Sequence, residues 1–155
     1  MRVRRVISGG QTGVDRGALD AAMELGIEHG GWCPLGRRAE DGTIPAHYTL
    51  RENPLPGYSA RTERNVVDSD ATLILASGPL RGGTHLTRHF AELYGRPILV
   101  IQITESEPAN IRSWLIEQQV EVLNVAGPRE SQSPGIQVQA KQLLFAVFAA
   151  RGPTA

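Results

Sequence analysis

The chain shows two patterns of hydrophobic and polar positions, and glycine or proline often stands where one gives way to the other. Nearly continuous apolar runs predict strands buried on both faces, at residues 3–8, 71–76, 97–103 and 121–126. A weaker strand is predicted at residues 27–32, where Gly30 and Gly31 interrupt the run. Apolar residues at helical spacing predict five helices, at residues 15–25, 59–68, 86–94, 108–118 and 133–151.

The ends of these helices follow from residues that favour helix termini. Ser59 and Ser133 are expected to be N-caps, with Pro134 at the first position of the last helix and the glycine-proline pair 152–153 ending it. Residues 33–58 contain several prolines and glycines and no sustained periodicity. We therefore expect them to form a long ordered loop.

Strands that alternate with helices predict an α/β fold. Each crossover between parallel strands is right-handed and returns the chain to the same sheet. We expect one Rossmann-like, doubly wound domain over residues 1–155, with a mainly parallel sheet of about five strands and helices on both faces. The sequence contains no internal linker or low-complexity tract that would divide it.

Two glycine-rich turns follow predicted strands and lead into predicted helices. Their residues are Gly9, Gly10, Gln11, Thr12 and Gly13 in the first turn, and Gly78, Gly82, Gly83 and Thr84 in the second. Free amides at a helix N-terminus, together with the helix dipole, favour phosphate-like anions. The first turn has neither the Walker nor the dinucleotide-binding spacing, and a tight turn without a ligand is the alternative.

The two turns define a predicted site if their strands are neighbours. Ligands of doubly wound sheets bind beyond the carboxyl ends of the strands, where the strand order reverses. Adjacent strands at 3–8 and 71–76 would place the turns side by side there. Arg61, near the start of the helix before the second of these strands, is expected to reach across to a phosphate, with Thr62 beside it.

Charge and cysteine content narrow the expected partners. Sixteen basic and sixteen acidic residues cancel, so no overall field draws the chain to nucleic acid or an anionic membrane. Lys141 is the only lysine, so almost all basic residues are arginines. Arginine suits bidentate contact with oxyanions, but a genome-wide coding bias is the better explanation of this excess. A single cysteine, Cys33, excludes an internal disulfide and a multi-cysteine zinc site. With no signal peptide and no membrane-spanning stretch, we expect a cytoplasmic protein.

Other chemically active side chains have simpler interpretations. Glu40 and Asp41 are candidates for an acid/base pair or for metal ligands, but solvation or pairing with arginines such as Arg37 is favoured. His85 and His89 stand four residues apart without the glutamate of a zinc motif, so surface positions are favoured. Cys33 lacks a nucleophile signature and is expected to be a small buried or loop residue. We assign no metal ligands and no catalytic residues.

Several motifs together carry a family resemblance. They are SGGQTGVD at residues 8–15, CPLGRRAEDGTIP at 33–45, RT at 61–62, NV at 65–66 and SDATLI at 69–74. In these the chain resembles the putative molybdenum carrier family, which is similar in turn to the YpsA and "lonely guy" (LOG) proteins of the SLOG group of Rossmann-like domains. The resemblance covers nearly the whole chain. It implies a homo-oligomer, a tetramer or dimer, that binds the molybdenum cofactor, a phosphate-bearing pterin with a molybdenum oxo centre.

The LOG enzymes are phosphoribohydrolases with the motif P-G-G-x-G-T-x-x-E after the corresponding strand and an arginine in the preceding helix. Arg61 matches that arginine by its spacing to Asp70. The second glycine turn reads LRGGTHLT at residues 80–87, so that Thr87 stands where these enzymes have their catalytic glutamate. A threonine cannot replace a carboxylate that stabilises cationic charge at the ribose. The resemblance therefore implies a retained phosphate site without LOG-type hydrolysis.

The leading hypothesis is a cytoplasmic binding or carrier protein for the molybdenum cofactor, with molybdate recognised separately by arginines and amides. The alternative is a hydrolase of a nucleotide or an ADP-ribose-type compound, in which Glu40, Asp41 or Asp15 supplies the carboxylate that Thr87 does not. A third hypothesis is a nucleotide-binding sensor without turnover. Nothing in the sequence distinguishes a pterin ring from a nucleotide base.

Overall fold

A computed structural model describes residues 1–149 and shows a five-stranded, entirely parallel central sheet. The strands are β1 (Arg5–Ile7), β2 (Glu28–Gly30), β7 (Ala71–Ala76), β8 (Ile98–Gln102) and β9 (Val122–Ala126). Their order across the sheet is β2-β1-β9-β7-β8. The α/β prediction is confirmed, and the interrupted run at 27–32 contains the edge strand β2 and the short β3.

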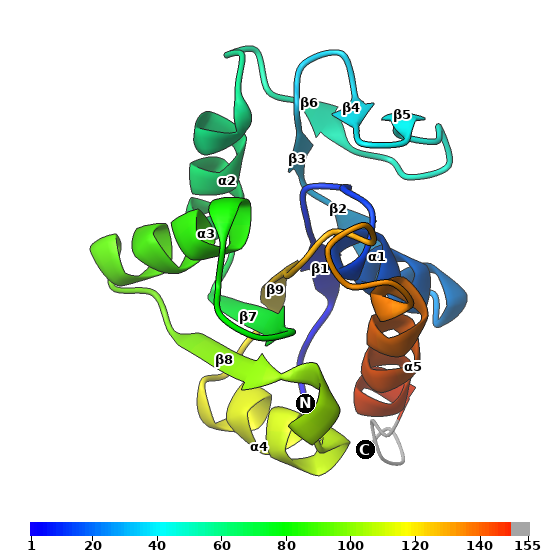
Figure 1. Ribbon diagram of the computed structural model, residues 1–155. Coiled ribbons are helices and arrows are strands. Elements are labelled where there is room, and N and C mark those ends of the chain that lie inside the picture. The colour runs from blue at the N-terminus through cyan, green and yellow to red at the C-terminus, as the bar shows by residue number, and fades with distance from the viewer. Residues whose placement is uncertain (150–155) are drawn as a thin grey trace.

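Helices cover both faces of the sheet (Figure 1). They are α1 (Val14–Glu24), α2 (Tyr58–Val67), α3 (Gly82–Leu93), α4 (Pro108–Glu117) and α5 (Ile136–Ala149), with a short 3₁₀ helix η1 (Ile103–Glu105). Helices α1, α4 and α5 pack on one face, and α2 and α3 pack together on the other. The fold is therefore doubly wound, as the sequence predicts. Within residues 1–149, the helices lack the length and apolar character needed to cross a membrane.

Three helix starts differ from the prediction. Helix α3 begins at Gly82, so Gly82, Gly83 and Thr84, which were predicted to lie in the turn before residue 86, belong to the helix. Helix α2 begins at Tyr58 with Gly57 as its N-cap, so Ser59 lies inside the helix. Helix α5 begins at Ile136, and Ser133 and Pro134 belong to the preceding turn, where the Ser133 carbonyl accepts a hydrogen bond from the Ile136 amide. Local turns take up residues that also favour helix caps. The predicted end at residues 152–153 lies outside the described residues.

The strand order corrects one expectation about the site. β1 and β7 are not neighbours, because β9 pairs with both of them. Numbering the strands from β7 through β8, β9 and β1 to β2 turns the order into 2-1-3-4-5, which is a common doubly wound arrangement. The strand order then reverses between β7 and β9. The first strand in the sequence, β1, is thus the fourth in this regular order. Sequence order therefore predicted the crevice at β1 and β7, whereas the reversal lies between β7 and β9.

The main core lies between the sheet and the layer of α1, α4 and α5, and Trp114 is a partly buried residue packed against it. A smaller cluster of Val66, Phe90 and Ala91 joins α2 to α3. Cys33 is fully buried, as predicted, in a third cluster with Leu19, Ile44 and Tyr48. This third cluster packs residues 33–57 against α1.

Residues 33–57 form an ordered excursion with two small sheets. β3 (Trp32–Cys33) pairs in parallel with β6 (Arg51–Glu52), and β4 (Arg38–Ala39) pairs antiparallel with β5 (Gly42–Thr43). The buried Arg16 on α1 donates to both carboxylate oxygens of Asp41, at 2.6 and 2.9 Å, and to the Gly10 carbonyl. Arg37 instead donates to backbone carbonyls of the loop. Asp41 is paired with an arginine, but the partner is Arg16.

We predict that Asp41→Asn lowers the free energy of unfolding by about 2 kcal/mol, because a buried guanidinium loses its charged acceptor. Urea unfolding at neutral pH measures the change. The control is Glu92→Gln, which breaks the exposed Arg88–Glu92 pair on α3 and should cost less than about 0.5 kcal/mol. Equal effects of the two substitutions would contradict the role of the Arg16–Asp41 pair.

Candidate functional site

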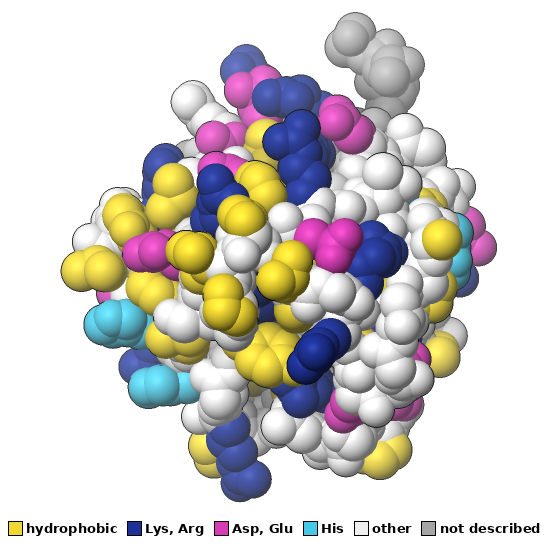
Figure 2. Space-filling model, turned by 90° about the horizontal axis from the view of Figure 1, so that it is seen from above, with side chains coloured by type: hydrophobic (Ala, Val, Ile, Leu, Met, Phe, Trp, Pro, Cys, Tyr) yellow, Lys and Arg dark blue, Asp and Glu magenta, His cyan; other side chains and the backbone are white. Residues whose placement is uncertain are grey.

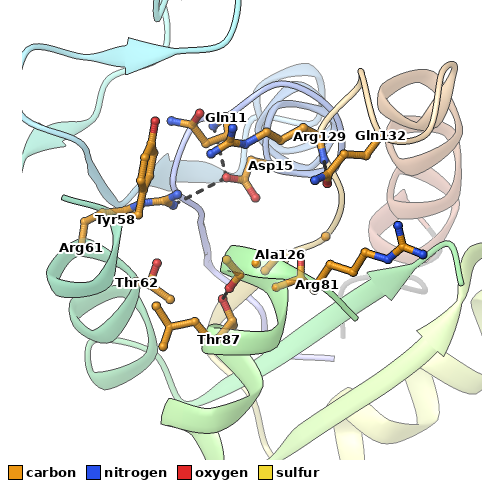
Figure 3. Close-up of a pocket in the computed structure, with 15 residues that line it drawn as sticks. Gln11, Asp15, Tyr58, Arg61, Thr62, Arg81, Thr87, Ala126, Arg129 and Gln132 are labelled. Carbon is orange, nitrogen blue, oxygen red and sulfur yellow. Dashed lines mark hydrogen bonds and ion pairs between the residues drawn. The ribbon is translucent and has the colours of Figure 1, made fainter. Parts of the chain in front are cut away.

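A cavity of about 350 Å³ lies beyond the carboxyl ends of β7 and β9, where the strand order reverses (Figure 3). Four parts of the chain enclose it: the turn after β1, helix α2, the start of α3 and the turn after β9. Its lining residues include Gln11, Asp15, Tyr58, Arg61, Thr62, Arg81, Gly82, Gly83, Thr84, Thr87, Arg129 and Gln132. The two glycine turns thus border one cavity although β9 separates their strands.

The second glycine turn presents the N-terminus of α3 to this cavity. Gly82 and Gly83 are the first residues of the helix, so no earlier helical carbonyl can accept from their amides. Both residues and Thr84 line the cavity, with Arg81 just before them. Gly78 does not line it, because its amide and carbonyl bond to the Gln102 side chain at 2.8 and 3.1 Å. The start of α3 therefore leaves backbone donors at the cavity.

The first glycine turn is used mainly for close packing. A Cβ at Gly10, where φ is +75°, would lie 2.4 Å from the Leu50 side chain, and one at Gly13 would lie 2.3 Å from the Pro128 carbonyl oxygen. The amide of Gln11 donates to the Asp15 carboxylate at 3.2 Å. The Asp15 carboxylate therefore accepts from one of the amides that the sequence suggested for a ligand. Of the residues of this turn, only Gln11 lines the cavity.

Thr12 and Glu40 connect the first turn to the segment after β9. The Thr12 hydroxyl donates to Glu40 and accepts from the Glu130 amide, and Ser131 also donates to Glu40. Hydrogen bonds from Ser131 and Thr12 lower the pKa of Glu40. Neither Thr12 nor Glu40 lines the cavity, and Asp41 is held by Arg16. Of the three carboxylates considered from the sequence, only Asp15 borders the cavity.

Arg61 is the buried cation of the site. It is 8% exposed and lines the cavity, yet within residues 1–149 its guanidinium makes no hydrogen bond; its nearest acidic atom is Asp15 Oδ2, at 3.9 Å from Nη1. A Cβ at Gly9 would lie 1.6 Å from the same Nη1, so glycine at this position makes room for the arginine. Burial lowers the pKa of Arg61, which the Asp15 charge opposes. Buried donors without acceptors are rare in folded proteins.

Asp15 is the acidic residue of the site whose pKa is shifted. Burial raises its pKa to about 6, against the opposing effects of Arg61, the Gln11 amide, Arg129 and Arg16. Figure 3 shows Asp15 grouped with Gln11 and Arg129 at one side of the cavity and Thr87 at the other. The Thr87 hydroxyl donates to the Gly83 carbonyl at 2.8 Å. A titratable group of this kind in a cavity is typical of functional sites.

Sequence reasoning missed Tyr58, Arg81, Arg129 and Gln132. The Arg61 and Arg129 guanidinium carbons lie 5.4 and 5.1 Å from the Tyr58 ring centroid. The signal that could have found Arg129 is the polar turn after the 121–126 strand, since that strand is next to the reversal of strand order. Figure 2 shows basic side chains interspersed with acidic ones over the face seen from above. His85 and His89 are exposed, as predicted.

Comparison with known proteins agrees with this geometry. A family model described as the circularly permutated YpsA SLOG family matches residues 6–148. The chain belongs to this family. Its permuted connection accounts for a strand order that becomes regular only when counted from β7.

One solved structure is similar to this cpYpsA-family chain over almost its entire length. It is the crystal structure of a protein named "Putative molybdenum carrier protein" from Syntrophus aciditrophicus, with 45% identity, a TM-score of 0.89, and coverage of 94% of this chain and 95% of that one. No curated protein matches the chain significantly. The neighbour supports the family resemblance read from residues 8–15, 33–45 and 61–74.

We predict that Asp15 makes the stability of the cpYpsA-family chain depend on pH. Its folded pKa of about 6 exceeds the ordinary 3.8, so the folded state holds the proton more tightly. The contribution of Asp15 to stability is then fully present below about pH 4, is lost as the pH rises to about 6, and stays absent above. Urea unfolding across this range should show the slope in the wild type. Asp15→Asn should abolish it, whereas exposed Glu117→Gln should not; an unchanged slope in Asp15→Asn would refute the assignment.

Proposed function

We propose that this protein binds and carries a molybdenum-containing cofactor, a phosphate-bearing pterin, in the cavity between β7 and β9. The observation that carries the proposal is the buried Arg61 guanidinium, which lines the cavity and has no hydrogen bond to any other residue among 1–149. The 45% identical neighbour named as a molybdenum carrier supports the choice of ligand. The proposed ligand is a small molecule, and we propose that a homo-oligomer binds and carries it in the cytoplasm.

The cavity residues fit such a ligand. A phosphate accepts hydrogen bonds from the Gly82 and Gly83 amides and the Thr84 hydroxyl, while Arg61 supplies charge-assisted donors. Tyr58 offers an aromatic face at the cavity for a flat ring. A volume of about 350 Å³ is within the usual range of small-molecule sites. Molybdate oxygens would find the same kind of donors.

The predicted binding residues divide into two groups on this proposal. Six of them line the cavity and are proposed to contact the ligand: Gln11, Arg61, Thr62, Gly82, Gly83 and Thr84. The remaining five are proposed to pack behind the lining residues without contacting the ligand, because protein atoms fill the space around them or they lie outside the cavity. They are Gly9, Gly10, Thr12, Gly13 and Gly78.

Native mass spectrometry of the protein purified from its own host tests the cargo directly. A bound species with the mass of a molybdenum-bearing pterin, and molybdenum in elemental analysis, is the expected result. A nucleotide mass in its place would move the ligand assignment to the nucleotide-binding hypothesis.

We predict that Arg61→Ala weakens the binding of GMP by about 1.5–3 kcal/mol, because a charged hydrogen bond to phosphate is lost. Calorimetry with GMP and guanosine measures this, since guanine shares its pyrimidinone edge with pterin. The loss should be much smaller for guanosine. The control is Arg64→Ala on the same helix, whose guanidinium stacks 3.9 Å from the Trp32 ring centroid and does not line the cavity. Equal losses for both ligands would show that Arg61 acts only on the fold.

A second candidate function is supported by Asp15. This buried carboxyl, with a pKa of about 6, borders the same cavity as Thr87, which stands where LOG enzymes have their glutamate. A hydrolase that acts on a nucleotide or an ADP-ribose-type compound would draw its carboxylate from here. Glu40 and Asp41 are excluded from direct contact with a ligand in this cavity by their positions outside it.

We predict no release of free base from nucleoside monophosphates by the wild-type protein. A charge-stabilising or acid/base carboxylate contributes roughly a hundredfold to ten-thousandfold in rate, and Thr87 cannot supply it. Chromatography of the products decides, with heat-unfolded protein as the blank. Thr87→Glu is expected to fold without necessarily gaining activity. Turnover that disappears in Asp15→Asn would replace the carrier with the hydrolase.

A further inference from the structure

A second cavity, of about 260 Å³, adjoins the first at the start of α3. It lies between the turn after β7 and the turn after β9, and it shares Arg81, Thr84 and Gln132 with the larger cavity. The free end of α3 therefore stands at the boundary between two spaces. A phosphate held at that end would have room for a substituent on either side.

The smaller cavity has walls suited to an uncharged ring or sugar. Pro79, Leu80 and Pro128 contribute apolar surface, and Ser77 contributes a hydroxyl. The Ser77 oxygen accepts from the Ser133 hydroxyl at 3.1 Å, so its own proton remains to be donated. Arg81 is the only charged side chain that lines this cavity within the described residues. The part of a ligand that enters the smaller cavity can therefore be uncharged.

The charge around the shared boundary matches a diphosphate. Three arginines, Arg61, Arg81 and Arg129, line the larger cavity, with Asp15 as the one carboxylate. Their sum is two positive charges when Asp15 is ionised, and a diphosphate diester carries two negative charges. Arg61 is the buried member of the three and has no hydrogen bond of its own within residues 1–149.

We propose that the site takes a ligand of the dinucleotide type, in which a diphosphate at the start of α3 joins two arms. One arm, the ring that contacts Tyr58, lies in the larger cavity, and the second, a nucleoside, lies in the smaller cavity against Leu80 and Ser77. This inference rests on the proposed function, since it places the phosphate of that ligand. It adds a second specificity pocket that a mononucleotide leaves empty.

Calorimetry with guanosine, GMP and diguanosine 5′,5′-diphosphate tests the inference on the full chain. The diphosphate should bind at least about tenfold more tightly than GMP, because a second ring is buried. Leu80→Trp, which fills the smaller cavity, should remove this advantage, so that the diphosphate binds the variant no more tightly than GMP does. Ser77→Trp, at an exposed position, provides a second filling variant. Leu93→Trp is the control, since Leu93 is 63% exposed and lines neither cavity.

The outcomes separate the two proposals. If GMP binds no better than guanosine, the phosphate site itself fails and the proposed function with it. If GMP binds through its phosphate but the diphosphate gains nothing, or if the gain survives in both filling variants, the two-armed ligand is overturned while the phosphate site stands. A gain that both fillings remove and Leu93→Trp retains supports the second pocket.

Discussion

The crevice of this protein exists because the chain leaves β7 and β9 toward opposite faces of the sheet. Helix α3 follows β7 onto the side of α2, whereas α5 follows β9 onto the side of α1 (Figure 1). Right-handed crossovers require this divergence wherever the strand order reverses. No helix can close the gap above these two strands without breaking that rule. The start of α3 and the turn after β9, which both border the cavity, are positioned by this constraint on the connections.

Within the crevice, one buried cation organises its neighbours. Arg61 occupies space that any side chain at residue 9 would fill, and it faces a carboxylate that also binds the Gln11 amide. The first glycine turn therefore supports the arginine, and the second supplies the open helix end. The glycines of the two turns therefore have different physical roles, although the turns look alike in sequence.

Local pattern was sufficient for the fold class and its elements, but not for the strand order or the site. Strand and helix periodicity are local properties, and they placed β7, β9 and the helices within a few residues. The neighbour relation between β1 and β9 joins residues more than a hundred positions apart, and the permuted connection hides it. Gly10 and Gly13 meet Leu50 and Pro128 only in the folded chain, so their packing role was not visible. The pKa of Asp15 depends on burial, which no motif reports.

The Arg61 guanidinium, which has no hydrogen bond within the described residues, has a consequence for how the molecule persists in the cell. Buried donors without acceptors cost stability, and a ligand that binds only the folded state adds stability that grows with the logarithm of one plus the ratio of its free concentration to its Kd. On the proposed function, empty carriers unfold more often than loaded ones. Proteases act on opened chains, so they remove empty molecules first and the surviving pool is enriched in cargo. Abundance of the carrier then follows the supply of its ligand without any change in synthesis.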